Sequence, residues 1–233
     1  MSKNKLILSL SSLVFFNLIG LATVFAQSKE NNFYLKTAFS ISKVSDIKVI
    51  EPGFNLKHHS AFSPAIGIGF GYYLNDNARI DLMFEHLRFD FKKQSSSFED
   101  NSENTFTTGT KYVERITYGK SLILNGYMDI IDKKTYKIFI GAGAGAVRLK
   151  ETIYNSLSGN TITSDQICSF PLITEPPTSK VSTNFTHSFM LGTSININPQ
   201  LNIELIYSWK NFGKVRNNKY QGHHFSIATR FDL

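Results

Sequence analysis

The chain has 233 residues, a formal net charge of +7 and 42% hydrophobic residues. After residue 26 no uninterrupted apolar stretch is long enough for a membrane helix, which excludes a helical membrane domain there. The only cysteine, Cys168, excludes an intramolecular disulfide, so the fold must hold without a covalent crosslink.

The N-terminal segment has the organisation of a secretory signal peptide. Lys3 and Lys5 form a basic start, and 6–25 is an apolar region. Small residues before the junction predict cleavage between Ala26 and Gln27, giving a signal peptide at 1–26 and one β domain at 27–233. Cleavage removes two lysines and no acid, so the formal charge falls from +7 to +5. A retained N-terminal membrane anchor is the alternative.

The rest of the chain alternates between long strand-like segments, short turns and long polar loops. Short turns are expected at 74–77, 131–134 and 198–200. The predicted strands are Asn32–Ser42, Phe62–Tyr73, Ala78–Phe91, Tyr112–Ile130, Thr135–Leu149, Phe185–Ile197, Leu201–Lys210 and Tyr220–Leu233. The predicted loops are about 43–61, 93–111, 150–184 and 211–219. Eight strands with short turns at one end and long loops at the other are typical of a transmembrane β-barrel.

Side-chain alternation fits either a membrane barrel or a soluble sandwich, because both bury one face of every strand. Three features favour the barrel. The strands are about long enough to cross a tilted path through a bilayer, and the glycines lie opposite the bulky apolar residues, as a narrow lumen requires. Aromatic residues also gather near strand ends, as interfacial girdles do. These aromatic residues are Tyr72, Tyr73, Tyr136, Tyr207, Trp209 and Phe231. The predicted fold is therefore all-β, an eight-stranded antiparallel up-and-down transmembrane β-barrel.

Two irregularities interrupt the alternation. In the third strand, Ile80 to Phe84 share one parity and Leu87 to Phe91 share the other, so we expect a β-bulge near Glu85-His86 to restore the register. Lys120 has the parity of the lipid-facing leucines. Its side chain therefore either faces lipid or lies at the membrane rim, where it is long enough to reach water.

Two segments resemble a known family. Leu122–Ile130 is similar to a strand that ends in Asn-x-Tyr-Tyr-Asp-Phe, and Phe139–Ala146 resembles the Tyr-x-Gly-x-Gly-x-Gly strand that follows it. Both occur in opacity-protein-like surface antigens, eight-stranded barrels related to outer membrane protein A. Family members commonly end in phenylalanine, whereas this chain ends in Leu233. The resemblance implies a surface-exposed, often immunogenic barrel of the bacterial outer membrane, with adhesins among its relatives, and it implies no enzyme.

Charged residues of inward parity lie near the short turns and the C-terminus. We predict that they form a charge network in the periplasmic half of the lumen, since buried charges need partners. The alternative is that some of them face periplasmic water. The residues are Arg79, Asp81, Asp129, Lys137, Glu204, Arg230 and Asp232.

The fourth loop carries a cluster of basic residues without an acid. Lys214, Arg216 and Lys219 form a candidate anion-binding patch, for lipopolysaccharide phosphates or acidic groups of a host surface. The alternative is that they only keep the loop solvated. Lys210 nearby has inward parity.

Other chemistries find little support. The pairs His58-His59 and His223-His224 could meet at one rim, but a metal site needs further ligands, and solvated histidines are the favoured interpretation. His187 and Ser188 are adjacent on one strand and point to opposite faces, which argues against a catalytic pair. We expect no enzyme activity, no metal, no cofactor and no nucleic-acid partner.

Two functions remain for an outer-membrane barrel of this kind. The first is adhesion, or another surface interaction of the loops with a host or with envelope components. The second is a structural role or a narrow pore, because the lumen of an eight-stranded barrel is filled by side chains. The expected partners are outer-membrane lipid and lipopolysaccharide, the outer-membrane assembly machinery, and a host-cell surface.

Overall fold

The computed structural model describes residues 32–45, 47–51, 54–58, 62–102, 105–133, 135–163 and 167–233. The predicted signal peptide, with its cleavage site at Ala26 and Gln27, lies outside the described residues. Within the described ranges, no helix has the length and apolar character needed to cross a membrane.

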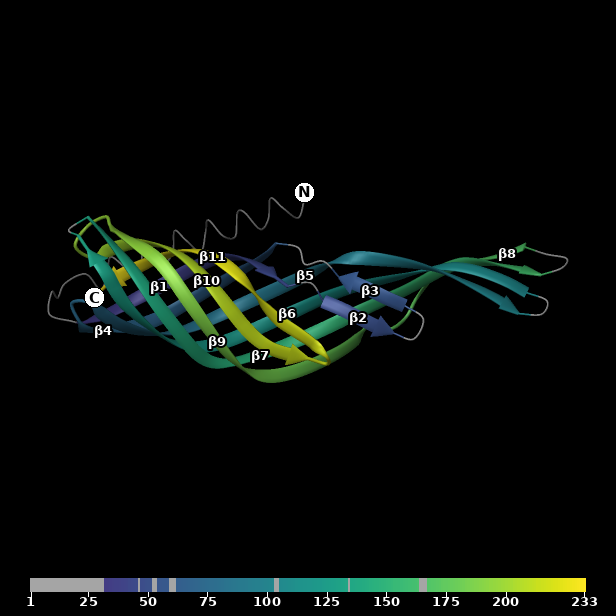
Figure 1. Ribbon diagram of the computed structural model, residues 1–233, viewed down its shortest axis with the longest axis horizontal. Helices are drawn as coiled ribbons and strands as arrows, with labels where there is room; N and C mark the ends of the chain where they lie inside the picture. Colours follow the sequence, from purple (N-terminus) through teal and green to yellow (C-terminus); the bar gives the residue numbers. More distant parts are fainter. Residues whose placement is uncertain are drawn as a thin grey trace.

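Eight antiparallel strands close into a ring (Figure 1). Around the ring the order is β6, β5, β4, β1, β11, β10, β9 and β7, and pairing between β6 and β7 completes the circle. The strands are β1 Phe33–Val44, β4 Ser63–Asn75, β5 Ala78–Ser102, β6 Thr105–Asp132, β7 Tyr136–Thr163, β9 Thr178–Asn196, β10 Leu201–Val215 and β11 Asn218–Asp232. Each predicted strand corresponds to one of these strands, and the predicted fold class is confirmed.

The four expected loops are largely paired strands. β5, β6 and β7 continue far beyond the barrel wall, where β8 (Ile167–Thr174) adds to β7 and forms an extension (Figure 1). A separate hairpin, β2 (Ile47–Glu51) with β3 (Phe54–His58), occupies the first expected loop. Strand pairing therefore continues into the segments expected as long polar loops, where neighbouring strands run side by side.

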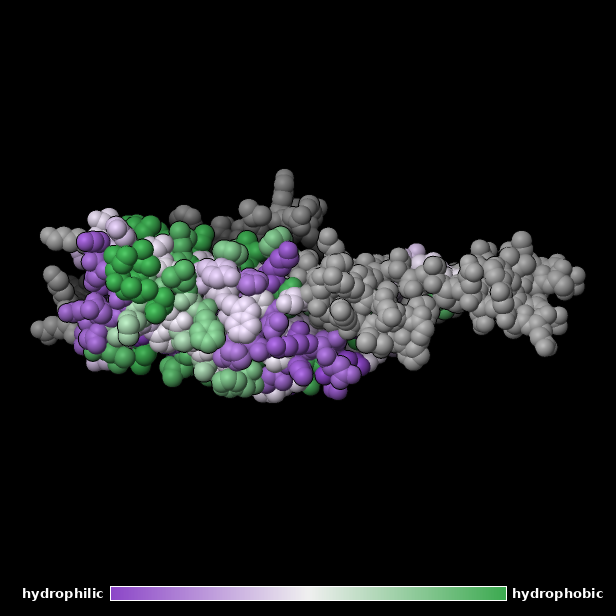
Figure 2. All heavy atoms as spheres, in the orientation of Figure 1, coloured by the Kyte–Doolittle hydropathy of each residue, from purple (hydrophilic) through white to green (hydrophobic). Residues whose placement is uncertain are grey.

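The barrel wall has an apolar outer face. Along β6, for example, Leu122 and Leu124 are half exposed, whereas Ile123 between them is buried in the lumen. Figure 2 shows the hydrophobic residues as a band on the barrel, with hydrophilic residues towards both ends. A sheet closed on itself with an apolar exterior satisfies its backbone within lipid.

The expected bulge near Glu85-His86 is absent. The pairing of β5 with β4 and with β6 runs without a shift through both residues, and the described register shift of the β5–β6 pair lies between Phe91 and Gln94. Phe89 and Phe91 therefore keep the inward parity of Arg79 and are buried. The change of parity among the apolar residues of β5 therefore marks the point where apolar side chains begin to fill the lumen.

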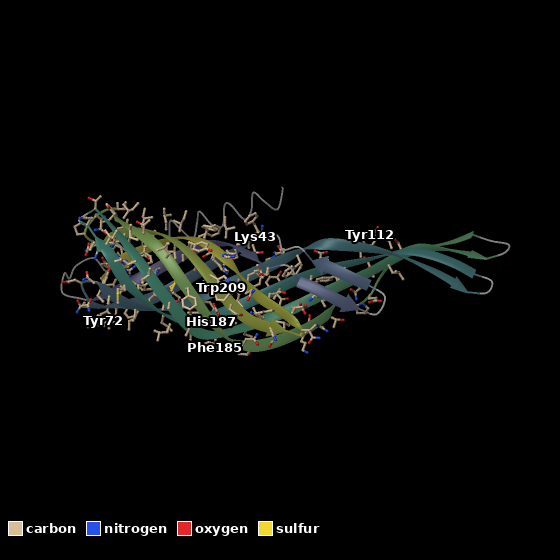
Figure 3. The ribbon with its side chains drawn as sticks, viewed as in Figure 1. Lys43, Tyr72, Tyr112, Phe185, His187 and Trp209 are labelled. Carbon is tan, nitrogen blue, oxygen red and sulfur yellow. The ribbon has the colours of Figure 1, made fainter. Side chains whose placement is uncertain are left out.

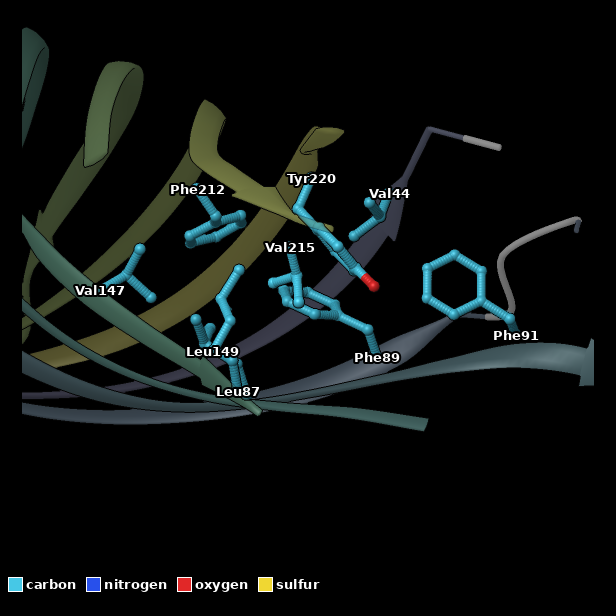
Figure 4. Close-up of a cluster of buried hydrophobic side chains, with 10 residues drawn as sticks. Val44, Leu87, Phe89, Phe91, Val147, Leu149, Phe212, Val215 and Tyr220 are labelled. Carbon is cyan, nitrogen blue, oxygen red and sulfur yellow. The ribbon is translucent and has the colours of Figure 1, made fainter. Parts of the chain in front are cut away.

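An apolar cluster fills the lumen towards the long-loop end (Figure 4). Its side chains come from six strands of the ring and point towards one another across the enclosed space. They are Val44, Ala65, Leu87, Phe89, Phe91, Val147, Leu149, Phe212, Val215 and Tyr220. A second group, Tyr127, Phe139, Met190, Ile206 and Ala228, packs nearer the short turns. Gly119 makes room for the apolar cluster: a Cβ atom on Gly119 would lie 2.9 Å from Cδ2 of Leu149 and 3.2 Å from Cδ1 of Leu87.

Candidate functional site

A charge network occupies the lumen near the short turns, and Glu204 is at its centre. The Glu204 carboxylate is fully buried and meets three cations from three other strands. Lys36 Nζ lies 2.9 Å from Oε2 and Arg79 Nη2 lies 3.1 Å from Oε1, which also accepts a hydrogen bond from Arg230. One carboxylate thus ties together β1, β5, β10 and β11.

The other predicted network residues lie around this centre. Arg79 donates to Asp129 at 2.7 Å, and Lys137 lies 3.2 Å from the second oxygen of Asp129. Arg230 Nε is 3.5 Å from Asp232, whose other contacts are the Tyr73 hydroxyl at 2.7 Å and the Asn202 amide. Lys137 and Asp232 remain partly exposed at the short-turn end, and the others are buried.

Asp81 joins the network through a residue that the sequence analysis missed. Lys36 Nζ is 3.4 Å from Asp81, and Asn125 donates to the same carboxylate at 2.8 Å. The seven predicted residues carry three positive and four negative charges, so Lys36 makes the set formally neutral. Its parity on β1, shared with the buried Tyr34 and Ser40, was the signal that could have identified it.

A second ion pair lies deeper in the lumen. Lys210 Nζ is 2.5 Å from Glu85 Oε1, and Ser121 donates to the other oxygen of Glu85. The inward parity of Lys210 is thus observed. Ser42 and His224 form a further buried contact, 2.5 Å between the hydroxyl and Nδ1. His224 is therefore not a solvated loop histidine, because it points into the lumen.

A third charged group lies beside the apolar cluster. Glu151 is fully buried and accepts hydrogen bonds from Arg115 at 2.5 Å and from the Tyr220 hydroxyl at 2.6 Å. Arg216, at the β10–β11 turn with a φ of 53°, places Nε 3.2 Å from the same carboxylate. Arg216 therefore points back to the barrel, which ties the turn to its interior.

The structure divides the predicted anion patch. Lys214 and Lys219 are exposed and directly opposite each other in the β10–β11 pair, where like charges repel. Arg216 is turned towards Glu151 and is only about one-third exposed. The remaining candidate patch is the pair Lys214 and Lys219.

The outer wall carries an aromatic surface on β9, β10 and β11 (Figure 3). The His187 ring lies between Phe185 and Trp209, at centroid distances of 6.0 and 5.7 Å. The Tyr207 hydroxyl is 2.7 Å from Nδ1 of His223. Tyr73, expected among the girdle aromatics near the short turns, instead turns inward to Asp232, because its parity is that of the inward glycines of β4.

No group of three or more histidine, cysteine or carboxylate side chains with metal-binding geometry occurs among the described residues. His223 and His224 point to opposite faces of β11, and His59 lies outside the described part of the chain. A cavity of about 630 Å³ opens at the short-turn end, where Asp76, Lys137 and Asp232 are among its lining residues.

Comparisons with known proteins agree with this architecture. Residues 11–230 match the family model described as "Outer membrane protein beta-barrel domain". The Rickettsia conorii protein named "Putative adhesin RC1281" is 31% identical over 229 residues, covering 89% of this chain and 85% of the relative. A Rickettsia canadensis protein named "Putative adhesin A1E_05320" is 27% identical over 224 residues, and the match covers 90% of this chain and 91% of that protein.

Similar solved structures are more distant. Neisserial surface protein A is 18% identical with a TM-score of 0.44, and the match covers 87% of this chain and 97% of that chain. Ail of Yersinia pestis is 13% identical with a TM-score of 0.43, covering 87% and 99%. The family model spans nearly the whole chain, and the first relative exceeds 30% identity over most of it. The chain therefore belongs to the outer-membrane β-barrel protein family and is a surface-exposed protein of the bacterial outer membrane.

Proposed function

We propose that this protein is an adhesin in which the barrel is a closed anchor and the long-loop end is the binding surface. One observation carries the proposal: β5, β6 and β7 continue as a paired extension far beyond the apolar wall. Such a long continuation serves no purpose within the bilayer and places a broad surface outside it. The adhesin names of the Rickettsia relatives support the same role.

The filled lumen argues against the alternative of a narrow pore. The Glu204 network, the Glu85–Lys210 pair and the apolar cluster around Phe89 follow one another along the axis. An ion would have to displace buried, mutually paired side chains at each level. The proposal assigns no enzyme activity and no cofactor. It includes export through a signal peptide cleaved after Ala26, and assembly by the outer-membrane machinery.

Shortening the extension should abolish adhesion without unfolding the barrel. In one variant residues 94–113 of the β5–β6 hairpin are replaced by an Asn-Gly turn, which suits a two-residue hairpin. The measurement is attachment of host cells to a non-adherent bacterium that displays either form. A matched control replaces the turn at 198–200 at the opposite end and should attach like the parent. Equal attachment by the shortened and parental proteins, both with the gel migration of a folded barrel, would refute this role for the extension.

The β10–β11 turn gives a separate prediction for anion binding. Lys214→Gln with Lys219→Gln should weaken heparin binding at low salt, with a loss that shrinks as salt rises, because exposed charges are screened. The same pair should leave the unfolding midpoint unchanged or slightly higher, since two like charges no longer face each other. Arg216→Gln should instead lower the unfolding midpoint, because the variant loses the contact between Arg216 and Glu151. Parental heparin binding by the double variant at low salt would remove the turn from the proposal.

A further inference from the structure

The outer wall carries a basic lattice that the proposed adhesion does not use. His86 of β5, Lys120 of β6 and Arg148 of β7 are direct cross-strand partners. The next row towards the long-loop end places Tyr118 between Arg88 and Lys150. All six side chains are exposed on the outer face, so Lys120 points outward as its parity predicted.

This lattice lies directly beyond the edge of the apolar band. The row below His86, Lys120 and Arg148 consists of Phe84, Leu122 and Ala146. All three are exposed and apolar, and the row beneath them is apolar as well. Along three neighbouring strands the lipid-facing surface thus changes from apolar to basic at the same step, which is where lipid headgroups meet a barrel wall.

The lattice holds like charges next to one another. Lys120 and Arg148 are directly opposite each other, with Cβ atoms about 5 Å apart, and like charges in such a pair are destabilising. Arg88 is the exception, since its Nε lies 2.9 Å from Asp90 and its guanidinium lies over the Tyr118 ring at 5.6 Å. Within the described part of the chain, no carboxylate pairs with Lys120, Arg148 or Lys150.

The surface beside the lattice suits an acyl chain. The outward residues of β7 below Arg148 are Ala142, Ala144 and Ala146, whereas the neighbouring strands present leucines on β6 and aromatic residues on β9. On β9 the residues opposite Arg148 and Lys150 are Thr183 and Val181, which carry no charge. The basic rows of β5, β6 and β7 therefore end at β7.

We propose that Lys120, Arg148 and Lys150, flanked by His86 and Arg88, bind the phosphate groups of an acylated, diphosphorylated sugar lipid in the outer leaflet. The phosphates offset the repulsion between Lys120 and Arg148, and an acyl chain lies along the alanines of β7. Arginine can hold a phosphate through two parallel hydrogen bonds, while lysines contribute point charges. This site is separate from the adhesive extension, so either role can fail without the other.

Binding of lipid A to the purified, folded protein in phosphatidylcholine nanodiscs tests the proposal. The triple variant Lys120→Gln, Arg148→Gln and Lys150→Gln should bind on the order of 100-fold more weakly, about fivefold for each basic residue. A charge-matched control, Lys43→Gln with Lys133→Gln and Lys180→Gln, should bind like the parent. The charge-conserving triple variant Lys120→Arg, Arg148→Lys and Lys150→Arg should retain most of the affinity for lipid A. This variant keeps the test decisive if the neutral triple variant folds poorly.

Two further arms identify the source of the phosphate. Dephosphorylated lipid A should bind the parent as weakly as lipid A binds the neutral triple variant. Inorganic phosphate at the same concentration as lipid A should not compete. Equal binding by the parent and the neutral variant, equal binding of the dephosphorylated lipid, or full competition by inorganic phosphate would each overturn the proposal.

Discussion

Replacing Glu204 by glutamine should lower the free energy of unfolding by about 3–5 kcal/mol, because it leaves buried cations without their shared partner. Lys36, Arg79 and Arg230 all meet this carboxylate, and each side chain is about 2–3% exposed. Each of these cations has a second carboxylate nearby. The network is formally neutral in the parent, however, and would carry one extra positive charge in the variant. The expected result is a clear fall in the urea midpoint of unfolding from lipid vesicles.

Asp132→Asn is the matched control for this prediction. Asp132 also pairs with a lysine, Lys137, at 2.8 Å, but its side chain is 42% exposed. An exposed ion pair contributes about 0–1 kcal/mol, so the control should unfold close to the parent. If Glu204→Gln and Asp132→Asn shift the midpoint equally, the network around Glu204 does not stabilise the barrel.

The membrane-crossing part of this fold could be predicted from the sequence because lipid imposes a strict rule. Each residue of a spanning strand faces either lipid or lumen, so alternation reveals both the strand and its direction. That rule placed Arg79, Asp129 and Glu204 on one interior surface. It applied equally to Lys36, which was missed only because a lone lysine in the first strand had no charged neighbour in the sequence.

Beyond the membrane the same rule no longer applies. In the extension, both faces of β5 and β6 can meet water, so no alternation is required, and pairing depends on strands that are distant in the sequence. The stretch 93–111 therefore had the composition of a polar loop although its backbone pairs as a hairpin. Arg216 was misplaced for a related reason, since only the tertiary fold brings Glu151 to the β10–β11 turn.

The error near Glu85-His86 had a different cause. If apolar residues always face lipid and polar residues always face the lumen, a change of parity requires a bulge. In this barrel the lumen itself changes from charged to apolar along its axis, from Glu204 to the cluster around Phe89. The parity of a residue along a strand gives the direction of its side chain. The polarity of that side chain does not show whether the direction is towards the lumen or towards lipid.

Phe89→Ala provides the direct test of that interpretation and should lower the free energy of unfolding by about 3–5 kcal/mol. Phe89 is 1% exposed, and its ring packs against Phe212 and Tyr220 at centroid distances of 5.4 and 6.1 Å. Truncation removes the apolar transfer energy and also leaves a cavity that a closed ring of strands cannot collapse to fill. The measurement is the urea unfolding midpoint in vesicles.

Phe185→Ala is the comparison that separates lumen from lipid. Phe185 is 67% exposed on the outer wall, where lipid flows into any space that a smaller side chain leaves. Its truncation should therefore cost at most the transfer term, roughly 1.5–3 kcal/mol, without a cavity term. With a bulge at Glu85-His86, Phe89 would face lipid like Phe185 and the two substitutions would have equal effects. A clearly larger loss at Phe89 requires a continuous register through β5 and an apolar plug in the lumen.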